Sequence, residues 1–182
     1  IQRQGYLDFL RRNRERPIVK VVFGIRRCGK STLFRLFKDE LLSTGVKPEQ
    51  IISINFEELE YEHLRDYHVL YQYILERMQP DQMNYIFLDE IQHVDQFHRV
   101  VDSLFVKENT DIYITGSNAY FMSSDIATLL TGRYVEIQML PLSFAEFYFS
   151  KYEEQQYSLI PAYEAYLRES SFPYTQQLGG ED

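Results

Sequence analysis

One eight-residue segment, Gly24 to Ser31, constrains the fold of this 182-residue chain more than any other. It reads Gly-Ile-Arg-Arg-Cys-Gly-Lys-Ser and matches the phosphate-binding pattern G-x-x-x-x-G-K-[ST]. The two glycines allow a tight turn that brings backbone N–H groups close to phosphate oxygens, because no Cβ stands in the way. Such a loop connects a strand to a helix whose positive end faces the phosphates. The segment therefore predicts a strand before residue 24 and a helix from residue 31.

The loop also predicts which residues hold a nucleoside triphosphate. Lys30 is expected to reach the β- and γ-phosphates, and the hydroxyl of Ser31 to complete the ligand shell of a Mg²⁺ ion. The residues expected to contact the nucleotide are Gly24, Ile25, Arg26, Arg27, Cys28, Gly29, Lys30, Ser31 and Thr32.

The hydrophobic pattern alternates between strand-like and helix-like segments up to residue 140. Strands that alternate with helices indicate a parallel sheet covered on both faces. The expected strands are 18–23, 51–56, 84–89, 111–115 and 134–139, and the expected helices are 3–14, 31–42, 61–78, 94–106 and 119–130. The predicted fold class is therefore α/β, a P-loop NTPase three-layer sandwich around a five-stranded parallel sheet.

Only helical patterns remain beyond Pro141. Ser143 and Glu146 have the spacing of a capping box, and a second helix is expected over 160–169. We therefore divide the chain into two parts. Residues 1–140 form the ATPase-like core, with the N-terminal helix 3–14 and the loop 24–31. Residues 141–182 form a helical extension, expected to be the start of a longer downstream region.

Two carboxylates follow the apolar strand at 84–89. Asp89 is expected at the carboxyl edge of the sheet, where it can hold Mg²⁺ through water. The adjacent Glu90 is placed to orient a water for attack on the γ-phosphate. The alternative is that both residues merely cap the next helix and interact with its dipole. With the phosphate loop upstream, we favour the catalytic interpretation.

A polar tip, Gly116-Ser117-Asn118, ends the strand expected at 111–115. Ser117 or Asn118 could contact the γ-phosphate or the attacking water, and the pattern does not choose between them. A turn rich in Gly, Ser and Asn is the plain alternative.

Charge is distributed unevenly along the chain, which carries a net charge of −8 at pH 7. Residues 1–30 hold nine Lys and Arg against two Asp and Glu, so the remainder is strongly acidic. An acidic body argues against broad nucleic-acid binding, because phosphate contacts need a basic surface. The basic head could still touch nucleic acid or a neighbouring subunit, or balance the acidic body as a solvated helix end. Its arginines before the first strand are Arg11, Arg12, Arg14 and Arg16.

Cysteine content and hydropathy bear on the compartment. Cys28 is the single cysteine, which excludes an intrachain disulfide and fits a reducing cytoplasm. Its place near Lys30 could depress the pKa of the thiol and allow redox control, although packing within the loop is the plainer interpretation. No run approaches the ~20 consecutive apolar residues that a membrane-spanning helix requires, so no membrane association is expected.

Together these segments resemble the AAA+ ATPase superfamily. They look closest to a group of prokaryotic predicted ATPases that carry a C-terminal region of unknown function after the core. The resemblance covers nearly the whole chain. It rests on five motifs: Gly24-Ile-Arg-Arg-Cys-Gly-Lys-Ser31, Phe87-Leu-Asp-Glu-Ile-Gln92, Thr115-Gly-Ser-Asn118, Leu129-Leu-Thr-Gly-Arg133 and Leu140-Pro-Leu-Ser-Phe144.

The resemblance implies the strand order 5-1-4-3-2, ATP as the nucleotide, and Asn118 or Ser117 as a sensor of the γ-phosphate. It also implies an arginine finger, because Arg133 stands just before the fifth expected strand. There it would reach the γ-phosphate of a neighbouring subunit in a homo-oligomer. A structural ion pair with Glu136 is the alternative. After the core only Arg168 is available as a second sensor arginine, and no motif marks it.

The main functional hypothesis is a Mg²⁺-dependent ATPase that drives a conformational change in an attached domain or an unknown protein partner. A second hypothesis is an ATP-gated switch with negligible hydrolysis, acting on a partner or near nucleic acid. A small-molecule kinase fits less well, because no arginine-rich lid follows the sheet.

Overall fold

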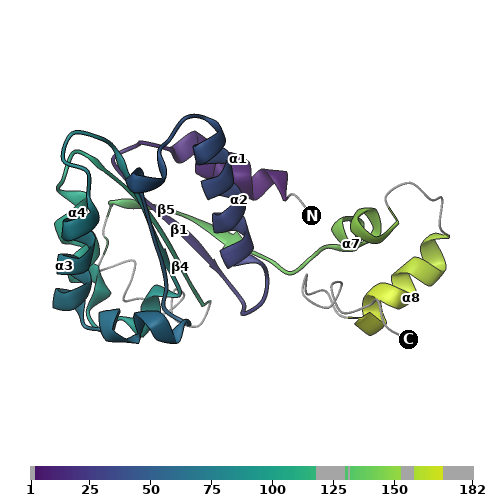
Figure 1. Cartoon of the computed structure of the whole chain (residues 1–182). Coiled ribbons are helices and arrows are strands. Elements are labelled where there is room, and N and C mark those ends of the chain that lie inside the picture. The colour runs from purple at the N-terminus through teal and green to yellow at the C-terminus, as the bar shows by residue number, and fades with distance from the viewer. Residues whose placement is uncertain (1–2, 118–129, 131, 153–157, 170–182) are drawn as a thin grey trace.

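A parallel five-stranded sheet forms the centre of the protein (Figure 1). The computed structural model describes residues 3–117, 130, 132–152 and 158–169. The strands lie in the order β2-β3-β4-β1-β5, and all neighbouring pairs are parallel. Read from the other edge, this is the predicted order 5-1-4-3-2. The strand bounds are β1 Val19–Gly24, β2 Ile51–Asn55, β3 Asn84–Asp89, β4 Thr110–Ser117 and β5 Tyr134–Met139.

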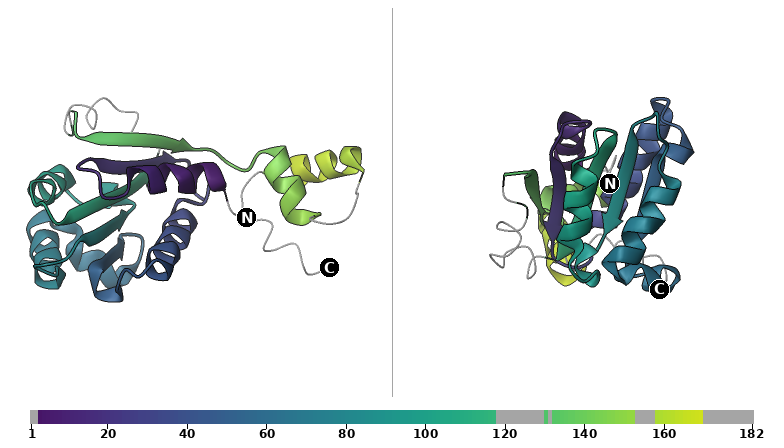
Figure 2. Two further views of the ribbon diagram at one scale, coloured as in Figure 1. Left: turned by 90° about the horizontal axis from the view of Figure 1, so that it is seen from above. Right: turned by 90° about the vertical axis from the view of Figure 1, so that its left-hand side faces the viewer.

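Helices cover both faces of the sheet, which confirms the predicted three layers (Figures 1 and 2). On one face lie α1 Gln4–Asn13 and α2 Lys30–Ser43, and on the other lie α3 Tyr67–Arg77 and α4 Phe97–Phe105. Three short 3-10 helices complete this part: η1 Pro48–Gln50, η2 Leu59–Arg65 and η3 Ile91–His93.

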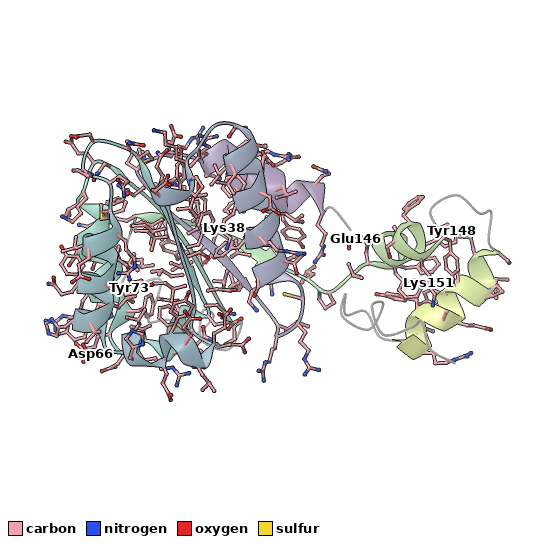
Figure 3. All side chains as sticks on the ribbon, in the orientation of Figure 1. Lys38, Asp66, Tyr73, Glu146, Tyr148 and Lys151 are labelled. Atoms are coloured by element: carbon pink, nitrogen blue, oxygen red, sulfur yellow. The ribbon has the colours of Figure 1, made fainter. Side chains whose placement is uncertain are left out.

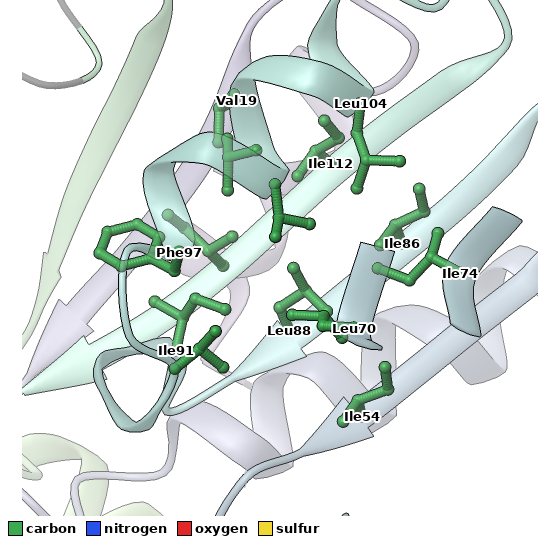
Figure 4. Packing of buried hydrophobic residues seen from close by; sticks show 14 of the residues in the cluster. Val19, Ile54, Leu70, Ile74, Ile86, Leu88, Ile91, Phe97, Leu104 and Ile112 are labelled. Carbon is green, nitrogen blue, oxygen red and sulfur yellow. The ribbon is translucent and has the colours of Figure 1, made fainter. Parts of the chain in front are cut away.

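Alternate residues of each strand face opposite layers, as the pleat of a sheet requires. Val21 packs in the cluster under α3 and α4, whereas Val22 packs in the cluster under α1 and α2. The α3 and α4 side is mainly aliphatic, although Phe97 also belongs to it, and Leu70 and Ile74 of α3 pack against residues of β3 such as Leu88 and Ile86 (Figure 4). Burying each of these side chains contributes about 1.5–3 kcal/mol.

The α2 side is aromatic instead. Phe87 of β3 stacks on Tyr113 of β4 with ring centroids 4.7 Å apart, and Phe34 of α2 meets Phe87 edge-on at 5.2 Å. Phe37, one helical turn further along α2, lies 5.4 Å from Tyr113. Offset and edge-on aromatic pairs add about 0.5–1.5 kcal/mol each beyond burial. This layer fixes α2 on the sheet, and with it the loop that precedes α2.

The segment predicted as one helix over 61–78 is two helices, η2 and α3. The chain changes direction at Asp66, whose backbone is extended (φ −78°, ψ 125°). The Asp66 carboxylate accepts hydrogen bonds from the N–H groups of His68 at 2.9 Å and Val69 at 3.1 Å. A side-chain cap satisfies donors that a helix start otherwise leaves free, so Asp66 begins a new helix.

The helix predicted over 94–106 starts later, at Phe97, because η3 and a residue in the left-handed region, Gln96 (φ 50°), come first. The helix predicted over 119–130 lies almost wholly outside the described residues.

The extension holds α7 Phe144–Lys151 and α8 Leu159–Glu169, which lie beyond one end of the sheet (Figures 1 and 2). The predicted capping box is present: the N–H of Glu146 donates to Ser143 Oγ at 3.2 Å, and the N–H of Ser143 donates to Glu146 Oε2 at 2.7 Å. Edge-on aromatic contacts join the two helices, with Phe147 5.3 Å from Tyr166. No described helix combines the length and apolar character needed to cross a membrane.

The Asp66 cap gives a stability prediction (Figure 3). Asp66→Ala should lower the free energy of unfolding by about 1 kcal/mol, because two N–H groups at the start of α3 lose their acceptor. Asp66→Asn keeps an acceptor oxygen at the same place and should lose less than half as much. Urea denaturation of the three proteins measures the difference. Equal stability of the alanine variant and the wild type would contradict the role of the cap.

Candidate functional site

The predicted phosphate loop joins the end of β1 to the start of α2. Gly24 lies at a crowded point, since a Cβ there would stand 2.4 Å from the carbonyl oxygen of Met139 and 2.7 Å from Cys28 Sγ. Gly29 has φ 105° and Arg27 has φ 66°, so both adopt left-handed conformations. The crowding explains the first glycine of the motif, and the conformation explains the second.

The start of α2 has no side-chain cap. Gly29 is the residue before the helix, and it makes no side-chain hydrogen bond to the first turn. The first N–H groups of α2 therefore carry the partial positive charge of the helix end without a capping side-chain oxygen, although the N–H of Lys30 interacts with the Cys28 side chain. This is the arrangement that binds phosphate in loops of this sequence pattern.

Lys30 is buried and points back over the loop. Its Nζ lies 3.0 Å from Glu90 Oε1 and donates to the carbonyl oxygens of Gly24 at 3.2 Å and Ile25 at 3.3 Å. The side chain that should bind phosphate is therefore paired with the proposed catalytic carboxylate.

Asp89 ends β3 and is almost fully buried, with 6% exposed. Burial raises the pKa of Asp89, and hydrogen bonds from the hydroxyls of Ser31 and Thr115 oppose that rise. The structure thus brings together Ser31 and Asp89, the two predicted Mg²⁺ ligands. Hydroxyl and carboxylate oxygens are hard donors, so this pair fits a Mg²⁺ ion.

Glu90 has an unusual backbone for a residue with a side chain, with φ 56° and ψ 49°. Its N–H donates to Thr115 Oγ1 at 2.9 Å, and its Oε2 accepts from Gln92 Nε2 at 2.6 Å. The left-handed conformation carries a cost in free energy that surrounding contacts must offset. The structure therefore holds this carboxylate in a fixed place beside Lys30.

Thr115 belongs to one of the five motifs, but the sequence predicted no role in the site for it. Its hydroxyl donates to Asp89 and accepts from the N–H of Glu90, so it positions both carboxylate residues. The register of β3 and β4 explains this, because Leu88 pairs with Ile114 and the next residues along each strand meet. A polar residue among the apolar residues of a buried strand is the signal that could have found it.

The polar tip of β4 also lies at this edge. Ser117 pairs with Gly24 in the β1–β4 register, so it stands beside the first residue of the phosphate loop. Asn118, the other predicted sensor, lies outside the described residues.

Arg133 lies at the opposite end of the sheet. Tyr134 pairs with Val19 at the start of β1, whereas the loop begins at Gly24, about 16 Å further on at ~3.3 Å per residue. The guanidinium of Arg133 lies 3.5 Å from Asp102 and 5.6 Å from the centre of the Phe105 ring. Among the described residues, its ionic partner is therefore Asp102 rather than Glu136. Arg133 cannot reach the loop of its own chain.

Cys28 is fully buried, and burial raises the pKa of its thiol against the opposing effects of Lys30 and Arg3. The idea of a depressed thiol pKa is wrong. Contact with Gly24 supports the packing interpretation instead.

Comparison with known proteins places the chain in a family. A family described as AAA domain matches residues 16–148, which is most of the chain. An uncharacterized protein of Haemophilus influenzae is 42% identical over 175 residues, a match that covers 95% of this chain and 44% of that protein. The chain thus spans less than half the length of this relative.

Two solved structures resemble the protein in fold. AMPPCP-bound DnaA from Aquifex aeolicus has a TM-score of 0.61 at 12% identity, and the match covers 94% of this chain and 56% of that chain. The Hsp104:casein complex of S. cerevisiae has a TM-score of 0.64 at 14% identity, covering 97% of this chain and 36% of that chain. The matched family, the strand order and the phosphate loop agree, and the chain belongs to the AAA domain family of AAA+ P-loop ATPases.

Proposed function

We propose that the protein binds ATP with Mg²⁺ and hydrolyses it. One observation carries the proposal: Lys30, Ser31, Asp89 and Glu90 converge at the carboxyl edge of the sheet, within one network of contacts. The AMPPCP in the related DnaA structure supports a triphosphate as the ligand.

The residues divide the work of hydrolysis. The N–H groups of the loop and of the first turn of α2 bind the phosphates. Lys30 leaves Glu90 and pairs with the β- and γ-phosphate oxygens, which carry more negative charge than one carboxylate. Ser31 and Asp89 hold the Mg²⁺ ion, which neutralises charge on the phosphates when it is bound. Glu90, released from Lys30, accepts a hydrogen bond from the attacking water and orients it.

The same contacts support a second candidate, an ATP-gated switch with negligible hydrolysis. In the structure Glu90 is held by both Lys30 and Gln92. If Gln92 kept the carboxylate away from the water after ATP binding, nucleotide would be held without turnover. The two candidates differ in phosphate release and agree in ATP binding.

Assembly is the third part of the proposal. Arg133 lies at the edge strand β5, with half of its side chain exposed, at the end opposite its own loop. In a ring of copies, each joined head to tail, this edge can face the loop of a neighbour. We propose that Arg133 acts in trans on that neighbour, and that turnover moves an attached domain or a protein partner. The net charge of −8 gives no support to a nucleic-acid partner.

Glu90→Gln should retain binding of Mg-ATP and reduce turnover by about 10²–10⁴, because the amide cannot take up a proton from water. Binding should be as tight as in the wild type or tighter, since Lys30 is no longer held by a carboxylate. Glu108→Gln, the same change at an exposed residue of the α4–β4 turn, is the control and should leave both quantities unchanged. Turnover of Glu90→Gln at the wild-type rate would contradict the assignment.

Mixed oligomers test the trans role of Arg133. Arg133→Ala and Glu90→Gln should each be inactive alone, because every site lacks either the finger or the water-orienting carboxylate. When the two variants are coexpressed with different tags and purified together, about a quarter of the sites combine an intact Glu90 with a neighbour's Arg133. Activity of the mixture should rise accordingly. A mixture no more active than its separate components would show that Arg133 is structural, through Asp102.

A further inference from the structure

The side chain of Arg3 connects three parts of the protein that are far apart in the sequence. Arg3 immediately precedes α1, and its side chain is only 7% exposed. It donates hydrogen bonds of 2.6–3.3 Å to the carbonyl oxygens of Cys28, Leu140 and Pro141 and to both carboxylate oxygens of Glu146, and a longer one of 3.5 Å to the hydroxyl of Tyr6. The guanidinium group has five N–H donors, so its full donor capacity is matched by acceptors.

One of these bonds acts on the phosphate loop. The carbonyl of Cys28 accepts from Arg3 Nη1, which fixes the plane of the peptide between Cys28 and Gly29. In a trans peptide the N–H points opposite to the carbonyl, so the N–H of Gly29 points away from Arg3. Gly24 also lies close to Met139 at the end of β5. Together, this approach and the bond from Arg3 hold residues 24–29 of the loop against the end of β5 and the segment that follows it.

The other bonds act on the extension. Leu140 and Pro141 belong to the segment that joins β5 to α7, and Glu146 lies in the first turn of α7 (Figure 3). Glu146 also closes the capping box through Ser143. Burial would raise the pKa of Glu146, but the bonds from Arg3 and Ser143 outweigh it and hold that pKa below its ordinary value. The carboxylate is therefore charged at neutral pH, where it can pair with Arg3.

We propose that Arg3 is a positioning residue for the phosphate loop and that Glu146 anchors it, so that a contact on the helical extension sets the affinity of the loop for nucleotide. This inference rests on the proposed binding of ATP at the loop. By linkage, nucleotide binding and the docking of α7 stabilise each other to the same extent.

The chemistry explains why arginine stands at this position. A lysine has three donors on one nitrogen and cannot serve a carboxylate and three carbonyl oxygens in the same plane. Arg3→Lys therefore keeps the charge and removes the geometry. Glu146→Gln does the reverse: glutamine serves equally well in a capping box, but it offers Arg3 no negative charge.

The chain supplies a matched control on the same helix. Arg11 of α1 binds both carboxylate oxygens of Glu40 at 2.7 Å, at an exposed site that has no contact with the loop in the structure. Arg11→Lys and Glu40→Gln make the same chemical changes to an ion pair of the same length. Titration calorimetry with Mg-AMPPCP measures Kd for the wild type, the four single variants and the double variant Arg3→Lys/Glu146→Gln. Melting temperatures without nucleotide are recorded beside it.

We expect Arg3→Lys to raise Kd for Mg-AMPPCP about tenfold and Glu146→Gln to raise it several-fold, because a charge-assisted contact that orients the loop is lost. The double variant should bind no more weakly than Arg3→Lys, since both changes disrupt the same contact between Arg3 and Glu146. Both control variants should bind within twofold of the wild type. Should Arg3→Lys fail to fold, Glu146→Gln against Glu40→Gln decides the question.

If Arg3→Lys and Glu146→Gln melt at a lower temperature yet keep the wild-type Kd, the inference is overturned and Arg3 is a purely structural residue. The inference is also overturned if Arg11→Lys and Glu40→Gln weaken binding as much as Arg3→Lys and Glu146→Gln do. A wild type that does not bind Mg-AMPPCP would instead contradict the proposed function itself, so the two failures are distinguishable.

Discussion

The parallel alignment of β3, β4 and β1 is the constraint on which the rest of the structure depends. Parallel strands end at the same edge of a sheet, and crossover helices return each strand to the same starting edge. The observed register therefore sets Gly24 beside Ser117, and Asp89 beside Thr115. The aromatic layer under α2 holds the other half of the site against this edge. The phosphate loop, the hydroxyl of Thr115 and the adjacent carboxylates of Asp89 and Glu90 thus meet from three separate parts of the sequence.

The sheet has a buried ion pair at each end, one of which a ligand can replace and one of which no ligand replaces. At the loop, Lys30 pairs with Glu90, and phosphate oxygens can replace that carboxylate. At the opposite end Lys20 and Asp111 form a fully buried pair, and Asp111 also accepts from Tyr113 and from the N–H of Glu15. Removing one member of such a pair leaves an uncompensated buried charge, which costs about 3–5 kcal/mol. The Lys20–Asp111 pair therefore holds the start of β1 in place. The Lys30–Glu90 pair can separate when phosphate binds, so only the loop end of the sheet changes its contacts with the ligand.

Local patterns predicted most of the fold and part of the site. The strong alternation of apolar runs and the loop motif placed all five strands, and Asp89 and Glu90 follow directly from an apolar strand. The break at Asp66 was missed because its carboxylate caps α3 inside a continuous helical pattern. Thr115 depends on strand register, and the contact between Arg3 and Glu146 spans 143 residues. A polar residue within an apolar strand could have marked Thr115, but strand register and the pairing of Arg3 with Glu146 have no local signature.

Phosphate release measured beside equilibrium binding tests the central claim most directly. Wild-type protein is titrated with Mg-ATP, and bound nucleotide and free phosphate are followed in the same samples over a range of protein concentrations. The account predicts binding at one site per chain and Mg²⁺-dependent phosphate release that rises per chain as copies assemble. Saturable binding with no phosphate release at any protein concentration would contradict hydrolysis and leave the ATP-gated switch.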